Sequence, residues 1–271
     1  MHRTLRDTLA GFSLAAALVA PFALIPPAEA AVPPPLVSGH RGATNVPGVT
    51  ENSVQAVEYA GQAGASVVEV DARWTSDGYV VVLHDDTLDR TTRCSGPVER
   101  VTFKQLRRCA DWRTVPILSH VYRAAGEHGM AVNVEVKAVA GRPLTDRQAR
   151  QLVAKAADAC AVQSTVWSSF SASTVAKVKA QPGARGGRFA LIATSRSAVS
   201  PAAARRIGTV YMAQHTSLTA AKVREYARAG VQVWAWPAKT YADYARLRSL
   251  GVAVIVADDP AKAAAYVQAG R

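Results

Sequence analysis

Seven titratable or charged side chains interrupt or directly follow apolar stretches in the first half of the chain. They are His40, Arg41, Glu69, Asp71, His84, Glu135 and Lys137. Glu69 and Asp71 are two residues apart, as are Glu135 and Lys137, so on a strand both members of each pair share a face. Three carboxylates gathered together repel one another unless a cation binds them. Ligands that are all oxygen favour Ca²⁺ or Mg²⁺ over zinc.

The remaining side chains suit the hydrolysis of a phosphate ester. Two histidines beside such a cation fit the roles of general acid and general base. Arg41 and Lys137 supply positive charge for a phosphate group. Each residue taken alone also has a structural interpretation, such as a simple ion pair between Glu135 and Lys137. Taken together, the residues predict metal-assisted phosphoester hydrolysis.

The elements that must position these residues follow a regular alternation. Nine short runs rich in Val, Ile and Ala are predicted strands: 36–42, 66–74, 79–85, 131–138, 164–170, 188–194, 209–215, 231–237 and 252–258. Helical patterns between them cover 52–64, 145–160, 218–230, 241–251 and 260–270. Strands that are apolar on both faces and alternate with helices predict a parallel sheet.

One connection reduces the parallel strands from nine to eight. Only four residues, 75–78, separate the second run from the third, and a parallel crossover needs a dozen or more. We therefore predict an α/β fold, a (β/α)8 TIM-type barrel with a β-hairpin and loop insertion over roughly 73–115. An open doubly wound sheet is the alternative, but no G-x-G-x-x-G follows the first strand. In a barrel, the polar residues gather at the C-terminal ends of the strands.

Composition and the N-terminus indicate a secreted globular protein. The 271 residues are 49% hydrophobic and 19% charged, which excludes wholesale disorder. The net charge of +12 favours anionic partners. Arg3 and Arg6, an apolar run over 12–25 and an A-x-A pattern ending at Ala30 predict a signal peptide over 1–30, cleaved near Ala30. A single-pass anchor is the alternative, and the mature domain is 31–271.

Export also decides how the three cysteines are interpreted. Cys94 and Cys109 bracket a short loop and are expected to form a disulfide in an oxidising compartment. Cys160 is left over, and we expect a buried thiol. A structural zinc site has too few closely spaced ligands.

Several motifs give the chain a family resemblance. They are HRG (40–42), TENS (50–53), EVDARWTSDG (69–78), VVLHDDTLDRTT (81–92), PILSHVYRAAG (116–126), NVEVK (133–137), SSF (168–170) and ADDP (257–260). In this order and spacing the chain resembles the glycerophosphodiester phosphodiesterase family over nearly all of 31–271. The resemblance implies a TIM-type barrel that hydrolyses glycerophosphodiesters to sn-glycerol 3-phosphate and an alcohol.

The resemblance also implies roles for individual residues. By motif position, the resemblance implies that His40 and His84 are the catalytic pair and that Glu69, Asp71 and Glu135 bind a divalent cation, Ca²⁺ or Mg²⁺. It implies that Arg41 and Lys137 contact the phosphate and that Glu51 and Asn52 support the site. Trp234 would pack beside the glycerol. The late strand departs from the family pattern, because it reads WAWP where W-T-V-N is usual. Trp236 then shares a face with Trp234, which leaves the leaving-group preference open. The nucleophile is either water or the glycerol 2-hydroxyl.

Two other functions remain open at this point. One is a phospholipase-D-like or sphingomyelinase-D-like activity on intact or lyso-phospholipids, which the basic surface and the paired tryptophans would suit. The other is a non-catalytic binder of anionic lipid or wall polymer. The expected partner is a small glycerophosphodiester, with peripheral contact to an anionic membrane or cell wall. Nucleic acid is not expected, because no groove-reading motif accompanies the charge.

Overall fold

The computed structural model describes residues 33–137 and 142–270. The expected signal peptide over 1–30 lies outside these residues, so secretion stays a prediction. Within the described ranges, no helix has the length and apolar character needed to cross a membrane.

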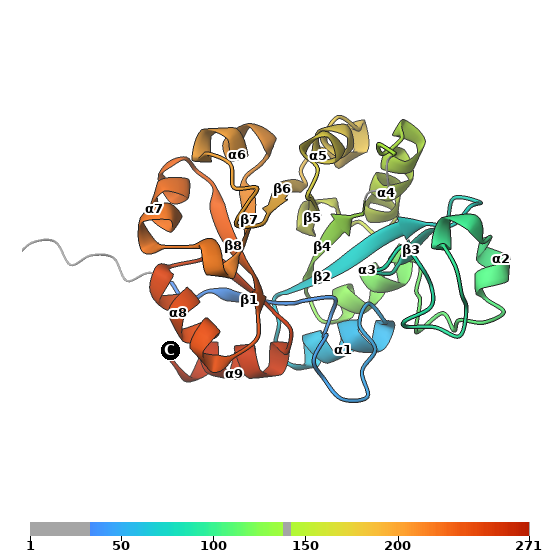
Figure 1. Ribbon diagram of the computed structural model, residues 1–271, viewed down its shortest axis with the longest axis horizontal. Coiled ribbons are helices and arrows are strands. Elements are labelled where there is room, and N and C mark those ends of the chain that lie inside the picture. Colours follow the sequence, from blue (N-terminus) through green and yellow to red (C-terminus); the bar gives the residue numbers. More distant parts are fainter. Residues whose placement is uncertain (1–32, 138–141, 271) are drawn as a thin grey trace, which may run out of the picture. The chain divides into compact units, whose positions relative to one another are not determined.

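Eight parallel strands form a closed ring (Figure 1). They are β1 (Leu36–Gly39), β2 (Val67–Trp74), β4 (Ala131–Val136), β5 (Thr165–Ser169), β6 (Arg188–Ala193), β7 (Val210–Gln214), β8 (Gln232–Ala238) and β9 (Val254–Ala257). The ring closes because β1 pairs with both β2 and β9, so that Gly39 lies between Val68 and Ala257. The predicted barrel is therefore confirmed, and the open sheet is wrong.

Helices surround the ring and follow most strands. They are α1 (Val54–Gln62), α3 (Leu118–Glu127), α4 (Asp146–Asp158), α5 (Ala172–Lys179), α6 (Pro201–Ile207), α7 (Ala220–Arg228), α8 (Tyr241–Leu250) and α9 (Pro260–Ala269). Most begin after a Ser, Thr or Asp whose side chain accepts a hydrogen bond from a backbone N–H of the first turn, as Thr145 and Thr240 do. The five predicted helices correspond to α1, α4, α7, α8 and α9.

Alternate residues of each strand face two different cores. Val68 and Val70 of β2, with Val134 and Val136 of β4, belong to the large apolar layer between strands and helices. Val67 belongs instead to a smaller cluster inside the ring. Because side chains alternate along a strand, Glu69 and Asp71 share the face of Val67 and point into the ring interior. Apolar packing on the outer face thus fixes the direction of these carboxylates.

The predicted insertion lies outside the ring. Strand β3 (Val80–Val82) pairs antiparallel with the end of β2, and a short 3-10 helix (Val98–Arg100) and α2 (Phe103–Leu106) follow it (Figure 1). The segment has an apolar cluster of its own around Leu88 and Leu106. It also contains the Cys94–Cys109 disulfide, which confirms the predicted pairing.

Cys160 differs from the expectation of a buried thiol. It is exposed and unpaired. The residue follows α4 in the left-handed conformation, with φ of 53°, which turns the chain away from the helix. The helical pattern therefore ends before Cys160, and its apolar character does not indicate burial.

The disulfide should stabilise the insertion more than the barrel. It links residues 15 apart, and closing such a loop contributes roughly 3 kcal/mol in the chain-entropy model. We expect the C94S/C109S variant to be cleaved faster by protease within 84–115 and to keep the barrel folded. Mapping the cleavage sites by mass spectrometry measures this, with C160S as the matched control. Equal cleavage of all three proteins would contradict the expectation.

Candidate active site

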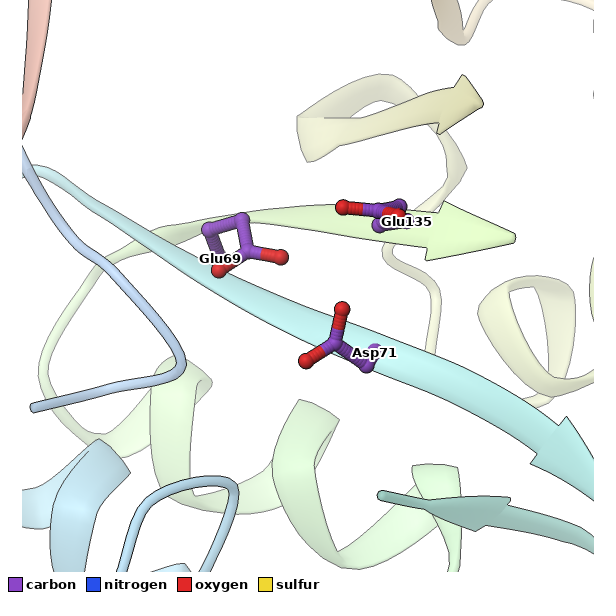
Figure 2. A group of neighbouring side chains, drawn as sticks. All are labelled: Glu69, Asp71 and Glu135. Carbon is purple, nitrogen blue, oxygen red and sulfur yellow. The ribbon is translucent and has the colours of Figure 1, made fainter. Parts of the chain in front are cut away.

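Three carboxylates from two neighbouring strands face a common space in the ring (Figure 2). Glu69 and Asp71 come from β2, and Glu135 comes from β4, whose register pairs Asp71 with Glu135. One oxygen from each carboxylate lies within 4.8 Å of the other two. The expected convergence of these three side chains is therefore present in the structure.

Burial makes this group electrostatically costly. Glu69 is 3% exposed and Asp71 is 1% exposed. Burial raises the pKa of Glu69 well above its usual range, and repulsion from Asp71 and Glu135 adds to the effect. Burial also raises the pKa of Glu135. For Asp71 burial acts in the same direction, but Lys137 and Arg41 outweigh it and lower the pKa to about 2.

The positive charges in the structure balance only part of the group. The Lys137 ammonium lies 2.5 Å from Glu135 Oε1 and 2.9 Å from Asp71 Oδ1. Glu69 accepts a hydrogen bond from the Arg41 backbone N–H through Oε2, at 2.7 Å, while its Oε1 is buried without a hydrogen-bond partner. A buried, unsatisfied carboxylate oxygen among oxygen ligands fits a hard divalent cation such as Ca²⁺ or Mg²⁺.

His40 follows β1 and is held by a residue at the other end of the chain. Its Nδ1 lies 2.6 Å from Asp258 Oδ1, directly after β9. The His40 backbone N–H also donates to the Ala257 carbonyl, at 2.9 Å. With Nδ1–H directed at the carboxylate, a neutral imidazole keeps Nε2 as a proton acceptor. Asp258 is not identified as a functional residue by the sequence alone, although it is the last residue of the predicted strand over 252–258 and part of the ADDP motif.

His84 reaches the site from the insertion and has a similar arrangement. Its Nδ1 lies 2.8 Å from Asp85 Oδ1, and Arg90 Nε donates to Asp85 Oδ2 at 2.6 Å. The Arg73 guanidinium donates to the His84 backbone carbonyl at 2.8 Å. Burial lowers the pKa of His84, whereas the nearby Asp71 charge acts in the opposite direction.

Arg41, Glu51 and Asn52 connect the first strand to the carboxylates. Arg41 Nη1 donates to Glu51 Oε1 at 3.0 Å, and its Nε lies 3.6 Å from Asp71 Oδ2. Asn52 donates to Asp71 Oδ2 at 2.7 Å and accepts from the Asp71 backbone N–H at 3.0 Å. Arg41 and Asn52 both have positive φ, 53° and 59°, which is uncommon outside glycine and concentrates at functional sites.

The comparison that decides the family covers most of the chain. The model of the glycerophosphoryl diester phosphodiesterase family matches residues 40–262, which include every candidate site residue above. The chain belongs to this family.

Relatives in the family agree in sequence over shorter stretches. A glycerophosphodiester phosphodiesterase of Caldanaerobacter subterraneus is 35% identical over 112 residues, which cover 38% of this chain and 45% of the relative. Human glycerophosphodiester phosphodiesterase 1 is 42% identical over 69 residues, covering 26% of this chain and 20% of the relative. The aligned stretches thus span less than half the length of either relative.

Solved structures of the family share the fold. An Oleispira antarctica phosphodiesterase, in complex with the product sn-glycerol-3-phosphate, has a TM-score of 0.75 at 21% identity, covering 86% of this chain and 97% of that one. A glycerophosphodiester phosphodiesterase of Parabacteroides distasonis has a TM-score of 0.74 at 19% identity, covering 88% and 98%. Both support the barrel architecture.

The position of Trp234 does not fit its expected role of packing beside the glycerol. Trp234 is 1% exposed and belongs to the cluster inside the ring, so its side chain is not open to a ligand. Its register partner is Val254, the first residue of β9, whereas Trp236 pairs with Gln214, the last residue of β7. Trp236 is therefore nearer the C-terminal rim. It packs edge-on against the exposed ring of Phe170, with centroids 5.5 Å apart.

Proposed function

We propose that the chain hydrolyses glycerophosphodiesters to sn-glycerol 3-phosphate and an alcohol, with a divalent cation and two histidines. The observation that carries this proposal is the pairing of two imidazoles, each with Nδ1 on a carboxylate, beside three converging carboxylates. The names of the relatives in the family point to the same reaction, and the Oleispira protein holds the corresponding product.

The three carboxylates Glu69, Asp71 and Glu135 would hold the cation, which supplies Lewis-acid stabilisation of the phosphate charge. Arg41 and Lys137 place further positive charge beside a bound phosphate. A bond forms between phosphorus and the nucleophile oxygen, and the bond from phosphorus to the alcohol oxygen breaks. One imidazole removes the proton of the nucleophile, and the other protonates the departing alkoxide.

The imidazoles are prepared for these roles by their carboxylate partners. Asp258 and Asp85 each fix the orientation and tautomer of one ring, which leaves Nε2 for proton transfer. His40 follows β1 and His84 lies in the insertion, and we assign one imidazole to the nucleophile and the other to the leaving alcohol. If the glycerol 2-hydroxyl is the nucleophile, a cyclic glycerol phosphate precedes the product, and ³¹P NMR during turnover detects it.

A substrate panel tests the proposal. The protein is assayed with glycerophosphocholine, glycerophosphoethanolamine and glycerophosphoglycerol, with Ca²⁺, Mg²⁺ or excess EDTA, and release of sn-glycerol 3-phosphate is measured. We expect cation-dependent release from all three. Release of choline from lysophosphatidylcholine or sphingomyelin vesicles, without turnover of the soluble diesters, would instead support the phospholipase-D-like alternative. Binding of anionic lipid or wall polymer without any turnover would support a non-catalytic role.

We further propose that the protein is secreted after cleavage near Ala30 and meets an anionic membrane or wall through its basic surface. The charge of +12 and the pattern of residues 1–30 support this. N-terminal sequencing of the exported protein should begin at about residue 31, and a retained N-terminus would support the anchor instead.

A further inference from the structure

A basic groove opens on the insertion, separate from the carboxylate group. It has a volume of about 730 Å³ and lies between residues 90–93 on one side and residues 107–111 with Thr114 on the other. Four arginines line it, at positions 90, 93, 107 and 108, against a single acidic residue, Asp111. Such an excess of guanidinium groups is suited to a phosphate-bearing ligand, because each can donate two parallel hydrogen bonds to phosphate oxygens.

The charge of this groove is poorly balanced within the protein. Among the described residues, no ion pair joins Arg93, Arg107 or Arg108 to a carboxylate, whereas Arg90 is paired with Glu51 and Asp85. Arg107 donates to the Val115 carbonyl at 2.5 Å and lies over the Phe103 ring, but its Nε and Nη1 are buried without partners. Arg93 and Arg108 are exposed, so their guanidinium groups can contact an anion that enters the groove.

The disulfide holds the two sides of the groove together. Cys94 directly follows Arg93 on one side, and Cys109 lines the other side next to Arg108. The covalent link therefore keeps like charges close to one another against their repulsion. A concave surface with fixed walls is better suited to a specific ligand than a mobile charged loop.

The groove begins beside the candidate catalytic histidine. Arg90 lines the groove and donates to Asp85 Oδ1 at 3.1 Å, and the same oxygen lies 2.8 Å from His84 Nδ1. Two hydrogen bonds thus connect the groove to the imidazole. One guanidinium and one carboxylate, those of Arg90 and Asp85, therefore stand between the groove and the His84 imidazole.

We propose that the groove binds a second phosphate group, carried by the leaving alcohol of the same substrate molecule. This inference rests on the proposed function and specifies its substrate class: glycerophosphodiesters whose alcohol portion contains a further phosphodiester. With deacylated cardiolipin, water cleaves one P–O bond and yields sn-glycerol 3-phosphate and glycerophosphoglycerol. With glycerophosphoglycerol, the same bond is cleaved, but the leaving glycerol has no phosphate for the groove.

The matched pair of substrates tests the groove. We expect wild-type kcat/KM to be about tenfold higher for deacylated cardiolipin than for glycerophosphoglycerol, the effect of one charge-assisted contact. R93Q/R108Q should lose this preference and keep its rate with glycerophosphoglycerol, because neither arginine contacts the candidate catalytic residues. R224Q removes an exposed arginine on α7 and serves as the control.

The outcomes separate this inference from the proposed function. Turnover of both substrates with no preference, unchanged in R93Q/R108Q, would overturn the groove alone. If neither substrate is cleaved, the proposed function fails. Calorimetry of the two compounds in EDTA then still tests the groove. We expect wild type to bind deacylated cardiolipin more tightly than glycerophosphoglycerol, and R93Q/R108Q to lose this difference. A third outcome is that R93Q/R108Q no longer sediments with phosphatidylglycerol vesicles, as wild type does, while its substrate preference is unchanged. The groove would then bind the phosphate of a lipid surface, and the proposed substrate subsite would be refuted.

Discussion

Replacing His84 with alanine should lower kcat for glycerophosphocholine by about 10²–10⁴-fold, the usual contribution of a general acid or base. His40→Ala should cause a loss of the same order. Both imidazoles lie beside the carboxylate group with Nδ1 on a carboxylate partner, so each variant removes a proton-transfer group and leaves the core intact. Steady-state kinetics of the purified variants measures the effect.

The matched control is His128→Ala, which removes an exposed imidazole at the end of α3. It should leave kcat unchanged. The double variant should lose little more than either single one, because residues that act in one proton-transfer sequence are not additive. Near-normal turnover by both single variants would refute the assignment of catalysis to these histidines.

Removing the divalent cation should reduce turnover by about a thousandfold or more, since a Lewis acid contributes several kcal/mol to transition-state stabilisation. The Glu69→Gln variant should show low activity at all cation concentrations. Glu69 is the carboxylate without a lysine contact and with a buried free oxygen, so its loss affects cation binding most directly.

Stability gives a readout of the same site that does not depend on turnover. At a cation concentration of 100 Kd, wild-type unfolding free energy should rise by about 2.7 kcal/mol, and Glu69→Gln should show little of this gain. In EDTA the variant should be more stable than wild type, because it removes repulsion within the buried group. Glu127→Gln, an exposed change on α3, is the control. Equal cation stabilisation of wild type and Glu69→Gln would contradict the ligand assignment.

Much of the fold could be predicted because the relevant signals are local. The two-residue spacing of Glu69 and Asp71 placed both on one face of a strand, and the four-residue link after Trp74 excluded a parallel crossover. The sequence patterns do not single out the ten-residue helix α3. They also do not single out α5 and α6, which have fewer than nine residues each and consist mostly of small side chains. Their weak periodicity differs little from that of a loop.

The differences at the site concern two properties: the position of a residue along the barrel axis, and contacts between residues far apart in sequence. Alternation along β8 predicts that Trp234 and Trp236 share a face, but it says nothing of height in the ring, which the register with β7 and β9 decides. The contact between His40 and Asp258 spans 218 positions of sequence, so only ring closure brings them together. The predicted helical pattern, which includes Cys160, extends two residues past the end of α4, and Cys160 lies outside the helix.

Closure of the ring by its first and last strands has a consequence for biosynthesis. The imidazole near the beginning of the chain receives its aspartate partner only when β9 has docked against β1. While the final segment is still in the ribosome, the chain therefore lacks the His40–Asp258 contact. Under the proposed function, a chain truncated before Asp258 should lack this contact and should not turn over substrate.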